Sequence, residues 1–477
     1  MLDINVYLNI KKNSMKKLTD FDSKIFKLIS VFFVVATFDV RTMKAAATLE
    51  LSVRKGISIV IPVCISGLND ASGTQKIIED NLKCSGFFRI LPTVGESSGT
   101  PNSEEFVDTV NLQSWSHVPG AMFVQAYLKE ENDQQVCRLS FFNALTKRCL
   151  GRRVVRQKGS NKRLFAHRIS NAIYKQFTGE AGYFHSVIAY TYEIQDSSSR
   201  VAKQCVALVS IDGKECKLIT SPSRTGAFLP HCARTRPIVT YLIDRGYGQH
   251  KQIGVMNFVE KTEFRLPYQR NFNSTRISSD GSEVIFSCSG ENGASLFTYN
   301  LNSGKAYPLT SAYNSCIDVS PSYSPDGKRM VFVSDREKGI PRLFVSGVHS
   351  GDAPLCISQG EGRYFAPAWS PCGKWIAFVK RVRGMHYLCV SDCNGGQERA
   401  IARALVIDRP SWGPNSRCLA YASKSGDMAP YKLYIVHAFG NPSGGSTVRL
   451  VPTIIQGVSH GANHPSWYPL SLEGHKE

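Results

Sequence analysis

The sequence predicts a six-bladed β-propeller that is closed by its own C-terminal strand and preceded by a small α/β domain. Three observations lead to this fold class: a motif repeated about every 45 residues, turn signals inside each repeat, and an incomplete repeat at each end of the array. The chain has 477 residues, of which 42% are hydrophobic and 20% charged. That composition argues against global disorder and leaves room for more than one domain.

The first 47 residues are typical of an export signal. Lysines precede the apolar run Ile25–Phe38, and Ala45–Ala47 offer a small-residue cleavage site. We predict a signal peptide over residues 1–47, with Met15 as an alternative start and a buried N-terminal helix as the alternative interpretation. These residues carry +4 of the formal charge of +19, so the exported part keeps about +15. The run is short for a transmembrane helix and no later segment is long enough, so no membrane insertion is expected after cleavage.

A short arm, residues 48–56, and an α/β domain, residues 57–184, are expected next because this part lacks the repeat. Its apolar residues recur with helical or strand periods. Gly, Ser and Pro are concentrated in one loop, Val94–Glu105. Strands are predicted at Gly56–Val63, Met122–Leu128 and Val136–Phe142, and helices at Ala71–Phe88, stopped by Gly86, and at Phe165–Phe177.

Residues 185–477 carry six copies of an apolar–apolar–aromatic core, which we assign to the propeller. The steps from one aromatic residue to the next are 51, 45, 46, 46 and 43 residues. A fixed period in this range is typical of propellers and other repeat folds. The six aromatic residues are Tyr190, Tyr241, Phe286, Phe332, Phe378 and Tyr421.

A proline eleven residues before the aromatic marks the opening strand of most repeats. Four repeats have it, at Pro230, Pro321, Pro367 and Pro410. Thr275 takes this place in the third repeat and Gly179 in the first, which has no recognisable opening strand. At the far end, Asn463–Leu470 offers a further proline and aromatic with no partner strand after them. We therefore expect the C-terminal strand to complete the first blade and close the ring.

Each repeat also contains the residues of tight hairpins. The turn Ser324–Gly327, "SPDG", combines the fixed φ of proline, a side-chain acceptor on Asp326 and a glycine suited to positive φ. The strands "KRMVFVS" and "PRLFVSGV" follow, and the short segment "APLCIS" ends the repeat. Four short strands per repeat are typical of a propeller blade, and six blades in a closed ring leave no long exposed edge.

All fourteen cysteines follow Ala47, so some of them are able to pair in an oxidising compartment. Cys137 with Cys149, and Cys205 with Cys216, are candidate pairs across hairpins, although spacing does not fix connectivity. There is no C-x-x-C motif. The Cys389–Cys393 spacing has no histidine nearby, which favours cysteines beside a turn over a metal site.

The histidines and the basic residues predict no further site. His460 and His464 are four residues apart, but Gly461 and Pro465 argue against a helix between them, so we interpret them as loop histidines rather than metal ligands. No run of Lys and Arg is interleaved with aromatic residues, and nucleic acid is therefore not an expected partner.

A hydrolase would need a serine in a G-x-S-x-G nucleophile elbow. The nearest string, Gly347–Asp352 ("GVHSGD"), has Ser350 out of position and falls in a turn between two strands. We predict no catalytic residue, metal or cofactor and do not expect an enzyme. A propeller related to the prolyl-oligopeptidase hydrolases is kept as an alternative.

The two regions together resemble the TolB family, exported proteins of the Tol–Pal cell-envelope system, over essentially all of the exported part. In the N-terminal region the resemblance rests on "SIVIPV…IIEDNLKCSGFFRIL" and on "IYKQFTGEAGYFHSVIAYTY" at the domain junction. In the ring it rests on the "SPDG"-type turns, on "RPSWGPNS" at Arg409–Ser416 and on the closing "HPSWYPL". Many propellers share the turn motifs, so the junction, the α/β region and the closing strand are the specific part.

This resemblance implies a non-enzymatic, monomeric scaffold of the periplasm that needs no cofactor. In the family the propeller binds the lipoprotein Pal, and an N-terminal arm contacts TolA or other Tol inner-membrane components. The system supports outer-membrane integrity, envelope constriction at division and protein import. By position, the arm comprises Thr48, Leu49, Glu50, Leu51, Ser52, Val53 and Arg54. The loops that lead into the first strand of five blades supply the Pal surface, namely Phe272, Asn273, Val319, Ser320, Tyr364, Phe365, Asp408, Arg409, Asn463 and His464.

A propeller that binds glycan or peptidoglycan is a second alternative, which the basic charge and the aromatic residues near the rim leave open. Tyr364 and Phe365 are equally suited to anchoring a partner and to packing between blades. Trp369, Trp412 and Trp467 lie inside the first strands, where packing is favoured.

Overall fold

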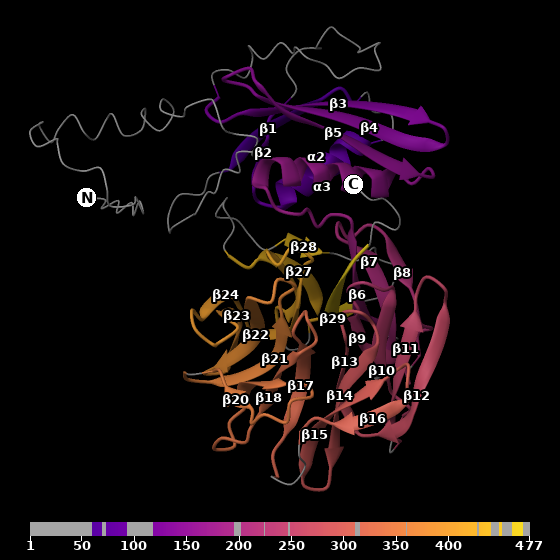
Figure 1. Cartoon of the computed structure of the whole chain (residues 1–477), viewed down its shortest axis with the longest axis vertical. Helices are drawn as coiled ribbons and strands as arrows, with labels where there is room; N and C mark the ends of the chain where they lie inside the picture. The colour runs from indigo at the N-terminus through magenta and orange to yellow at the C-terminus, as the bar shows by residue number, and fades with distance from the viewer. Residues whose placement is uncertain are drawn as a thin grey trace, which may run out of the picture. The chain divides into compact units, whose positions relative to one another are not determined.

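The computed structural model is a six-bladed β-propeller with an N-terminal α/β domain, as predicted (Figure 1). The structure describes residues 60–68, 73–92, 118–194, 202–223, 225–246, 249–310, 315–358, 360–426, 429–439, 448–450 and 460–470. All of them fall within one compact unit, Ser52–Glu477. The predicted signal peptide, arm and loop, at 1–47, 48–56 and Val94–Glu105, lie outside the described residues. Neither of the helices in the described ranges is long and apolar enough to cross a membrane.

The α/β domain is built on one five-stranded sheet. Its strands are β1 (Ile61–Ser66), β2 (Phe88–Ile90), β3 (Met122–Glu131), β4 (Gln134–Asn143) and β5 (Cys149–Lys158). They lie in the order β2-β1-β3-β4-β5. β1 runs parallel to β2 and β3, whereas β3, β4 and β5 form an antiparallel meander. A parallel pair needs a crossover connection, and the helix between β1 and β2 provides it.

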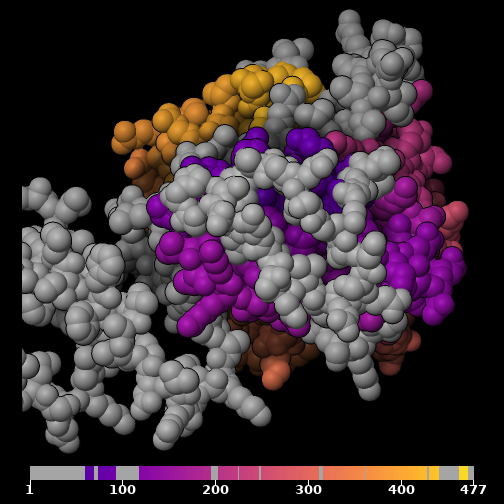
Figure 2. All heavy atoms as spheres, turned by 90° about the horizontal axis from the view of Figure 1, so that it is seen from above, coloured from indigo at the N-terminus to yellow at the C-terminus, as the bar shows by residue number. Residues whose placement is uncertain are grey.

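Two helices, α2 (Thr74–Cys84) and α3 (Lys162–Thr178), pack against this sheet. Asn161 caps α3, because its Oδ1 accepts hydrogen bonds from the backbone N–H groups of Arg163 (3.1 Å) and Leu164 (3.0 Å). Gly179, with φ of 72°, ends the helix. Apolar side chains of both helices, the sheet and the first and last blades form one buried cluster. Figure 2 shows the outer surface of the α/β domain in violet and magenta.

Each blade is a four-stranded antiparallel sheet. From the innermost strand outwards, blade one consists of β29 (His460–Pro469), β6 (Ser186–Ile194), β7 (Lys203–Ser210) and β8 (Cys216–Leu218), and blade two of β9 (Ala227–Cys232), β10 (Ile238–Ile243), β11 (Lys251–Asn257) and β12 (Thr262–Arg270). Blade three consists of β13 (Phe272–Ile277), β14 (Glu283–Gly290), β15 (Gly293–Asn300) and β16 (Lys305–Pro308), and blade four of β17 (Asp318–Tyr323), β18 (Arg329–Ser334), β19 (Arg342–Gly347) and β20 (Leu355–Cys356). Blade five consists of β21 (Arg363–Trp369), β22 (Trp375–Val382), β23 (Met385–Asp392) and β24 (Arg399–Ala404), and blade six of β25 (Val406–Trp412), β26 (Cys418–Lys424), β27 (Lys432–His437) and β28 (Val448–Leu450).

The C-terminal strand closes the ring, as predicted. β29 pairs antiparallel with β6, with Trp467 opposite Ile188 and Pro469 opposite Ser186. It packs between the innermost strands of blades six and two, β25 and β9. In Figure 1 the yellow β29 therefore lies beside the magenta β6 although their residues are more than 250 positions apart.

The repeated aromatic residues belong to the second strand of each blade and are all buried, with exposed fractions between 0 and 5%. The "SPDG" turn precedes that strand. In blade four the Ser324 Oγ accepts the N–H of Arg329 (2.9 Å), and Asp326 Oδ1 accepts the N–H of Lys328 (3.1 Å). Gly327 has φ of 70°, which explains why glycine stands there. The repeat therefore reflects one hairpin used in five blades, whereas in blade one the first two strands, β29 and β6, come from opposite ends of the chain.

Three predictions for the α/β domain need correction. The first strand begins at Ile61 and runs to Ser66 within the described residues, Phe88 belongs to β2 rather than to a helix, and β5 was not predicted at all. β5 is the edge strand of the sheet, and most of its side chains are exposed. Because an edge strand tolerates exposed arginines, its sequence "CLGRRVVRQK" lacks the apolar alternation that identifies a half-buried strand.

The two predicted cysteine pairs do not form, and all fourteen cysteines are free. Cys137 lies opposite Val155, whereas Cys149 lies opposite Phe142. Cys205 lies opposite Tyr192, and Cys216 opposite Val209. The sequence spacing suggested facing positions, but the observed registers place the members of each pair several residues apart along their strands.

Candidate functional site

The innermost strands share a bulge that shapes the inside of the ring. In five blades the pairing register shifts across the proline, for example between Val319 and Ser322 around Pro321. In blade three, where Thr275 replaces the proline, Thr275 pairs normally and the shift lies before Ser274. Proline has no N–H for the ladder, so a bulge accommodates it. The residue before the proline has positive φ in four blades: Leu229 (55°), Ser320 (54°), Ala366 (47°) and His464 (52°).

A belt of hydrogen bonds joins neighbouring blades just after this bulge. The side chain that follows the proline accepts a backbone N–H from the innermost strand of the next blade. The four bonds of the belt are Cys232 N–H to Ser466 Oγ (2.9 Å), Ile277 N–H to His231 Nδ1 (3.1 Å), Trp369 N–H to Ser322 Oγ (3.1 Å) and Trp467 N–H to Ser411 Oγ (2.8 Å). Blades three and five have Arg276 and Ala368 at this position, and neither side chain can accept.

Charged side chains from opposite blades face one another inside the ring. Burial and the Arg409 guanidinium lower the pKa of Arg276 to about 9, although Asp408 opposes this effect. The pKa of His464 falls to about 4, because burial outweighs the nearby Asp408 carboxylate. Burial and the neighbouring guanidinium of Arg276 also hold the pKa of His231 well below its ordinary value. At neutral pH both histidines are therefore uncharged, and two guanidiniums face one carboxylate.

The ten residues predicted to contact a partner lie at the start or in the middle of five innermost strands rather than in the loops before them. The strands begin earlier than predicted because the bulge lets the chain pair on both sides of the proline. Phe272, Tyr364 and Asn463 have exposed fractions of 0, 0 and 4%, so their side chains are not part of the surface. The Tyr364 hydroxyl donates to Glu398 Oε2 (3.1 Å), and its burial favours packing over anchoring.

Seven of the ten residues are half-buried, namely Asn273, Val319, Ser320, Phe365, Asp408, Arg409 and His464. Asn273 Nδ2 donates to Ser289 Oγ (2.8 Å), and the N–H of Ser320 donates to Ser274 Oγ (3.2 Å). Val319 and Phe365 pack partly against the blade cores. Their role in binding stays a prediction. The three strand tryptophans, Trp369, Trp412 and Trp467, are 1 to 4% exposed, which confirms that they pack.

The two ends of the innermost strands have different neighbours. Near its C-terminal end, β29 contacts the α/β domain, because the Trp467 and Tyr183 rings lie 5.9 Å apart edge to face. The Trp467 Nε1 also donates to Ser186 Oγ (2.7 Å). All innermost strands run in the same direction around the ring, so their N-terminal ends lie on the opposite face. That face carries the half-buried residues Val319 and Phe365.

The two C-terminal histidines are strand residues, not loop residues as predicted, because β29 spans His460–Pro469. His464 Nε2 lies 3.4 Å from Asp408 Oδ2, which also accepts the backbone N–H of His464 (3.3 Å). Within the described residues no group of three or more His, Cys, Asp or Glu side chains is suited to hold a metal ion.

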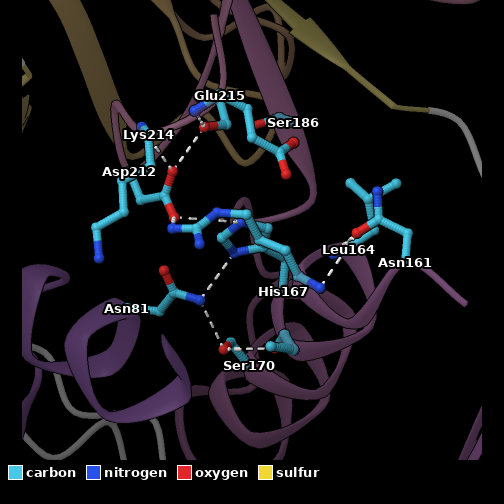
Figure 3. Close-up of polar contacts among 12 residues, drawn as sticks. Asn81, Asn161, Leu164, His167, Ser170, Ser186, Asp212, Lys214 and Glu215 are labelled. Carbon is cyan, nitrogen blue, oxygen red and sulfur yellow. Dashed lines mark hydrogen bonds and ion pairs between the residues drawn. The ribbon is translucent and has the colours of Figure 1, made fainter. Parts of the chain in front are cut away.

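A second polar cluster lies between the two helices and blade one (Figure 3). Ser170 Oγ donates to the Ala166 carbonyl (2.8 Å) and so must accept from Asn81 Nδ2 (2.9 Å). The other proton of that amide then points at His167 Nδ1 (2.9 Å). The ring therefore carries its proton on Nε2, 3.6 Å from Asp212 Oδ2. Burial lowers the pKa of His167 to about 4, so it is neutral at pH 7.

Asp212 links this cluster to the propeller. It is the aspartate of the "SIDG" turn between β7 and β8 of blade one. Asp326 has the same place in the "SPDG" turn between β17 and β18 of blade four, but it bonds only within its own turn. Arg163 of α3 donates to Asp212 Oδ2, and the Ser210 hydroxyl donates to Oδ1 (2.6 Å). Although burial raises it, hydrogen bonds from Ser210, from Arg163 and from the backbone N–H of Lys214 hold the pKa of Asp212 below its ordinary value.

A cavity of about 230 Å³ borders this cluster. Its lining mixes polar and aromatic side chains, including Asn81, Arg163, Tyr183 and Asp212. None of these residues was predicted as a site. One signal was available in the sequence: the polar His167 and Ser170 interrupt the apolar face of a helix that also presents Phe165 and Ile169. The cluster joins α2, α3 and blade one, and its geometry is that of a polar contact between domains.

A comparison with protein families shows which family the chain belongs to. The family described as "TolB beta propeller domain" (PD40) matches residues 174–470, which include all six blades. The chain belongs to the TolB family. The resemblance noted in the sequence is thereby confirmed at the level of the family and of the fold.

Two individual proteins support the same assignment. The chain is 28% identical over 440 residues to the "Tol-Pal system protein TolB" of Gluconobacter oxydans, and the match covers 89% of each chain. Its fold is similar to the crystal structure of TolB from Acinetobacter baumannii, with a TM-score of 0.71 and 20% identity, over 86% of this chain and 97% of the other. The second comparison supports the fold alone.

Proposed function

We propose that this chain is the propeller scaffold of a Tol–Pal system: an exported periplasmic protein that is monomeric, is not an enzyme and binds the lipoprotein Pal. The observation that carries this proposal is the family match over the complete ring, from residue 174 to 470. The relative from Gluconobacter oxydans, named as a Tol–Pal system protein, extends along nearly the whole chain. In this role the protein supports outer-membrane integrity, constriction at division and protein import.

The partner surface in this proposal is the propeller face that carries the starts of the innermost strands. The inter-blade belt below this face holds the strands in fixed positions. A rigid face loses little conformational entropy when it binds, and many small contacts can then add up to useful affinity. Val319 and Phe365 supply apolar contact area, and Asn273 and Asp408 supply polar contacts around it.

Binding of Pal to purified, mature protein tests the proposal. Val319→Lys places a charge on the proposed face and is expected to weaken binding at least about tenfold, as the loss of a central apolar contact does. Leu145→Lys is the matched control, because Leu145 is 64% exposed in the β4–β5 turn of the α/β domain. We expect it to bind like the unchanged protein. Equal affinities for the two variants, with both folded by circular dichroism, would contradict the proposed face.

Two further outcomes would favour the alternatives. Retention of the protein on purified peptidoglycan sacculi without Pal would favour direct glycan binding. Stoichiometric labelling by a serine-hydrolase probe would favour an enzyme. The serine of the "GVHSGD" string, Ser350, gives no support to the second outcome: its Oγ accepts the N–H of Asp352 (3.3 Å) within the turn between β19 and β20.

The proposed arm contact concerns Thr48–Arg54, outside the described residues. A mature protein that begins at Ser52 instead of Thr48 would lose part of this arm. We expect weaker capture of TolA from envelope extract with Pal binding still detectable. Unchanged capture of TolA would argue that the arm is not the contact.

A further inference from the structure

The interior of the ring contains an unusual basic residue. Arg276 occupies the position after the bulge, where blades one, four and six have Ser466, Ser322 and Ser411 as hydrogen-bond acceptors. The residue is only 4% exposed. Its Nε and Nη2 atoms are buried and have no hydrogen-bond partner among the described residues. A buried charged donor without a partner is costly, so this position calls for a ligand.

The surroundings of Arg276 lack the negative charge needed to balance it. β13 and β25 belong to blades three and six, which are opposite each other in a ring of six. Arg409 and Asp408 of β25 therefore face Arg276 across the ring axis. The Asp408 carboxylate is already engaged, because its Oδ2 lies 3.4 Å from His464 Nε2 and accepts the His464 backbone N–H. Two guanidiniums thus share one carboxylate.

The other polar groups around the axis do not supply the missing acceptor. His231 Nδ1 accepts the Ile277 N–H, so the neutral ring has its proton on Nε2 and can only donate there. Arg234 extends from the end of β9 in blade two and donates to the Trp369 carbonyl (3.0 Å) of blade five, across the ring. This adds a third guanidinium near the axis. The available groups are thus mainly donors.

We infer that the inside of the ring binds a small oxyanion, a phosphate or carboxylate group, on the Nε–Nη2 edge of Arg276, with Arg409 providing a second positive charge. The Nε and Nη2 hydrogens of a guanidinium are parallel and match two oxygens of one such group. Both nitrogen atoms are buried in this structure, so binding requires the Arg276 side chain to turn toward the ring axis, where the low dielectric strengthens the interaction with the anion. This inference concerns a site inside the ring and does not depend on the identity of the protein partner.

Thermal unfolding of the mature protein in phosphate and in acetate, at constant ionic strength, tests this inference. At a hundred times the dissociation constant we expect the anion to raise Tm by about 3 °C, with a saturable dependence on concentration. The anion that saturates at the lower concentration identifies whether a free phosphate or a carboxylate, such as an acidic side chain, is the better ligand. Absence of a saturable shift with both anions would overturn the inference.

The substitution Arg276→Ser provides the sharpest variant, because serine is the belt residue of three other blades. We expect it to fold, to keep or raise Tm without anion, and to lose the anion-dependent shift. Arg276→Gln, which keeps a similar length without the charge, should behave alike. Arg153→Ser, on the exposed edge strand β5, is the matched control and should respond like the unchanged protein. A shift of equal size in the Arg276 variants and the control would mean that the anion acts elsewhere.

Discussion

Trp467→Ala should destabilise the protein strongly, because the Trp467 side chain joins the closing strand β29 to the start of blade one and to the α/β domain. The side chain is 4% exposed, packs edge to face on Tyr183 and donates its indole N–H to Ser186. Burying about 150–250 Å² at roughly 25 cal/mol per Å² is worth about 4–6 kcal/mol. Partial collapse of the cavity reduces this loss, and large-to-small aromatic changes in cores cost about 3–5 kcal/mol. We therefore expect a loss of about 4 kcal/mol in the free energy of unfolding.

Differential scanning calorimetry measures this effect as a fall in Tm of about 4 °C, since an unfolding entropy of about 2.1 cal/mol/K per residue makes 1 kcal/mol correspond to about 1 °C in a chain of this size. Trp467→Phe is the control. It keeps the ring contact with Tyr183 and removes the hydrogen bond to Ser186, so it should cost only about 1–2 kcal/mol. A loss below about 1 kcal/mol for the alanine variant would refute the reasoning, because it would mean that this strand contributes little to the ring.

Three further predictions concern the ring, its turns and the domain junction. Deletion of Asn463–Glu477 should lower the free energy of unfolding by several kcal/mol, on the scale of losing multiple buried residues, and should expose the edge of β6. An unchanged Tm would count against closure of the ring by this strand. Gly395→Ala should be severely destabilising, because the new Cβ would lie 1.7 Å from the Ile357 carbonyl oxygen and φ is 88°. The control Gly384→Ala has a similar φ of 82° but nothing within 4 Å of the new Cβ, so it should cost only about 1–2 kcal/mol. Equal losses of stability in urea unfolding would refute the clash. The folded state holds His167 neutral with a pKa of about 4, below its ordinary 6.5, so the stability that neutral His167 contributes is complete above pH 6.5 and is lost as pH falls toward 4. His167→Gln should therefore reduce the loss of unfolding free energy over this pH range by up to about 3 kcal/mol. A pH profile of stability like that of the unchanged protein would contradict the assignment.

The ring could be predicted from the sequence because its hairpins are local and repeated. Each "SPDG"-type turn and each buried aromatic residue depends on neighbours within one blade, so the same residues recur at a period near 45. Closure was also predictable, because an opening strand is missing at one end and spare at the other. The edge strand β5 was missed for the opposite reason: its exposed arginines do not need an apolar pattern.

The polar sites were much harder to predict, because they depend on contacts between distant segments. Asp212 belongs to a turn that the sequence repeats in several blades, and nothing in that turn shows that Arg163 and His167 will lie beside it. Arg276 could have been noticed as the one charged residue at the belt position. To recognise Arg276 as part of a site, one has to align the blades at the bulges of their innermost strands and to know that blades three and six face each other. The residues expected in loops at the partner surface lie in the innermost strands, and Phe272, Tyr364 and Asn463 are buried there.

Hydrogen exchange of the C-terminal strand tests the closure of the ring most directly, because closure requires β29 to be a full member of the first blade. The backbone amides of His460–Pro469 should exchange as slowly as those of a central strand such as β14, Glu283–Gly290. Exchange of the C-terminal segment within seconds, while β14 remains protected, would mean that the ring is not closed in this way.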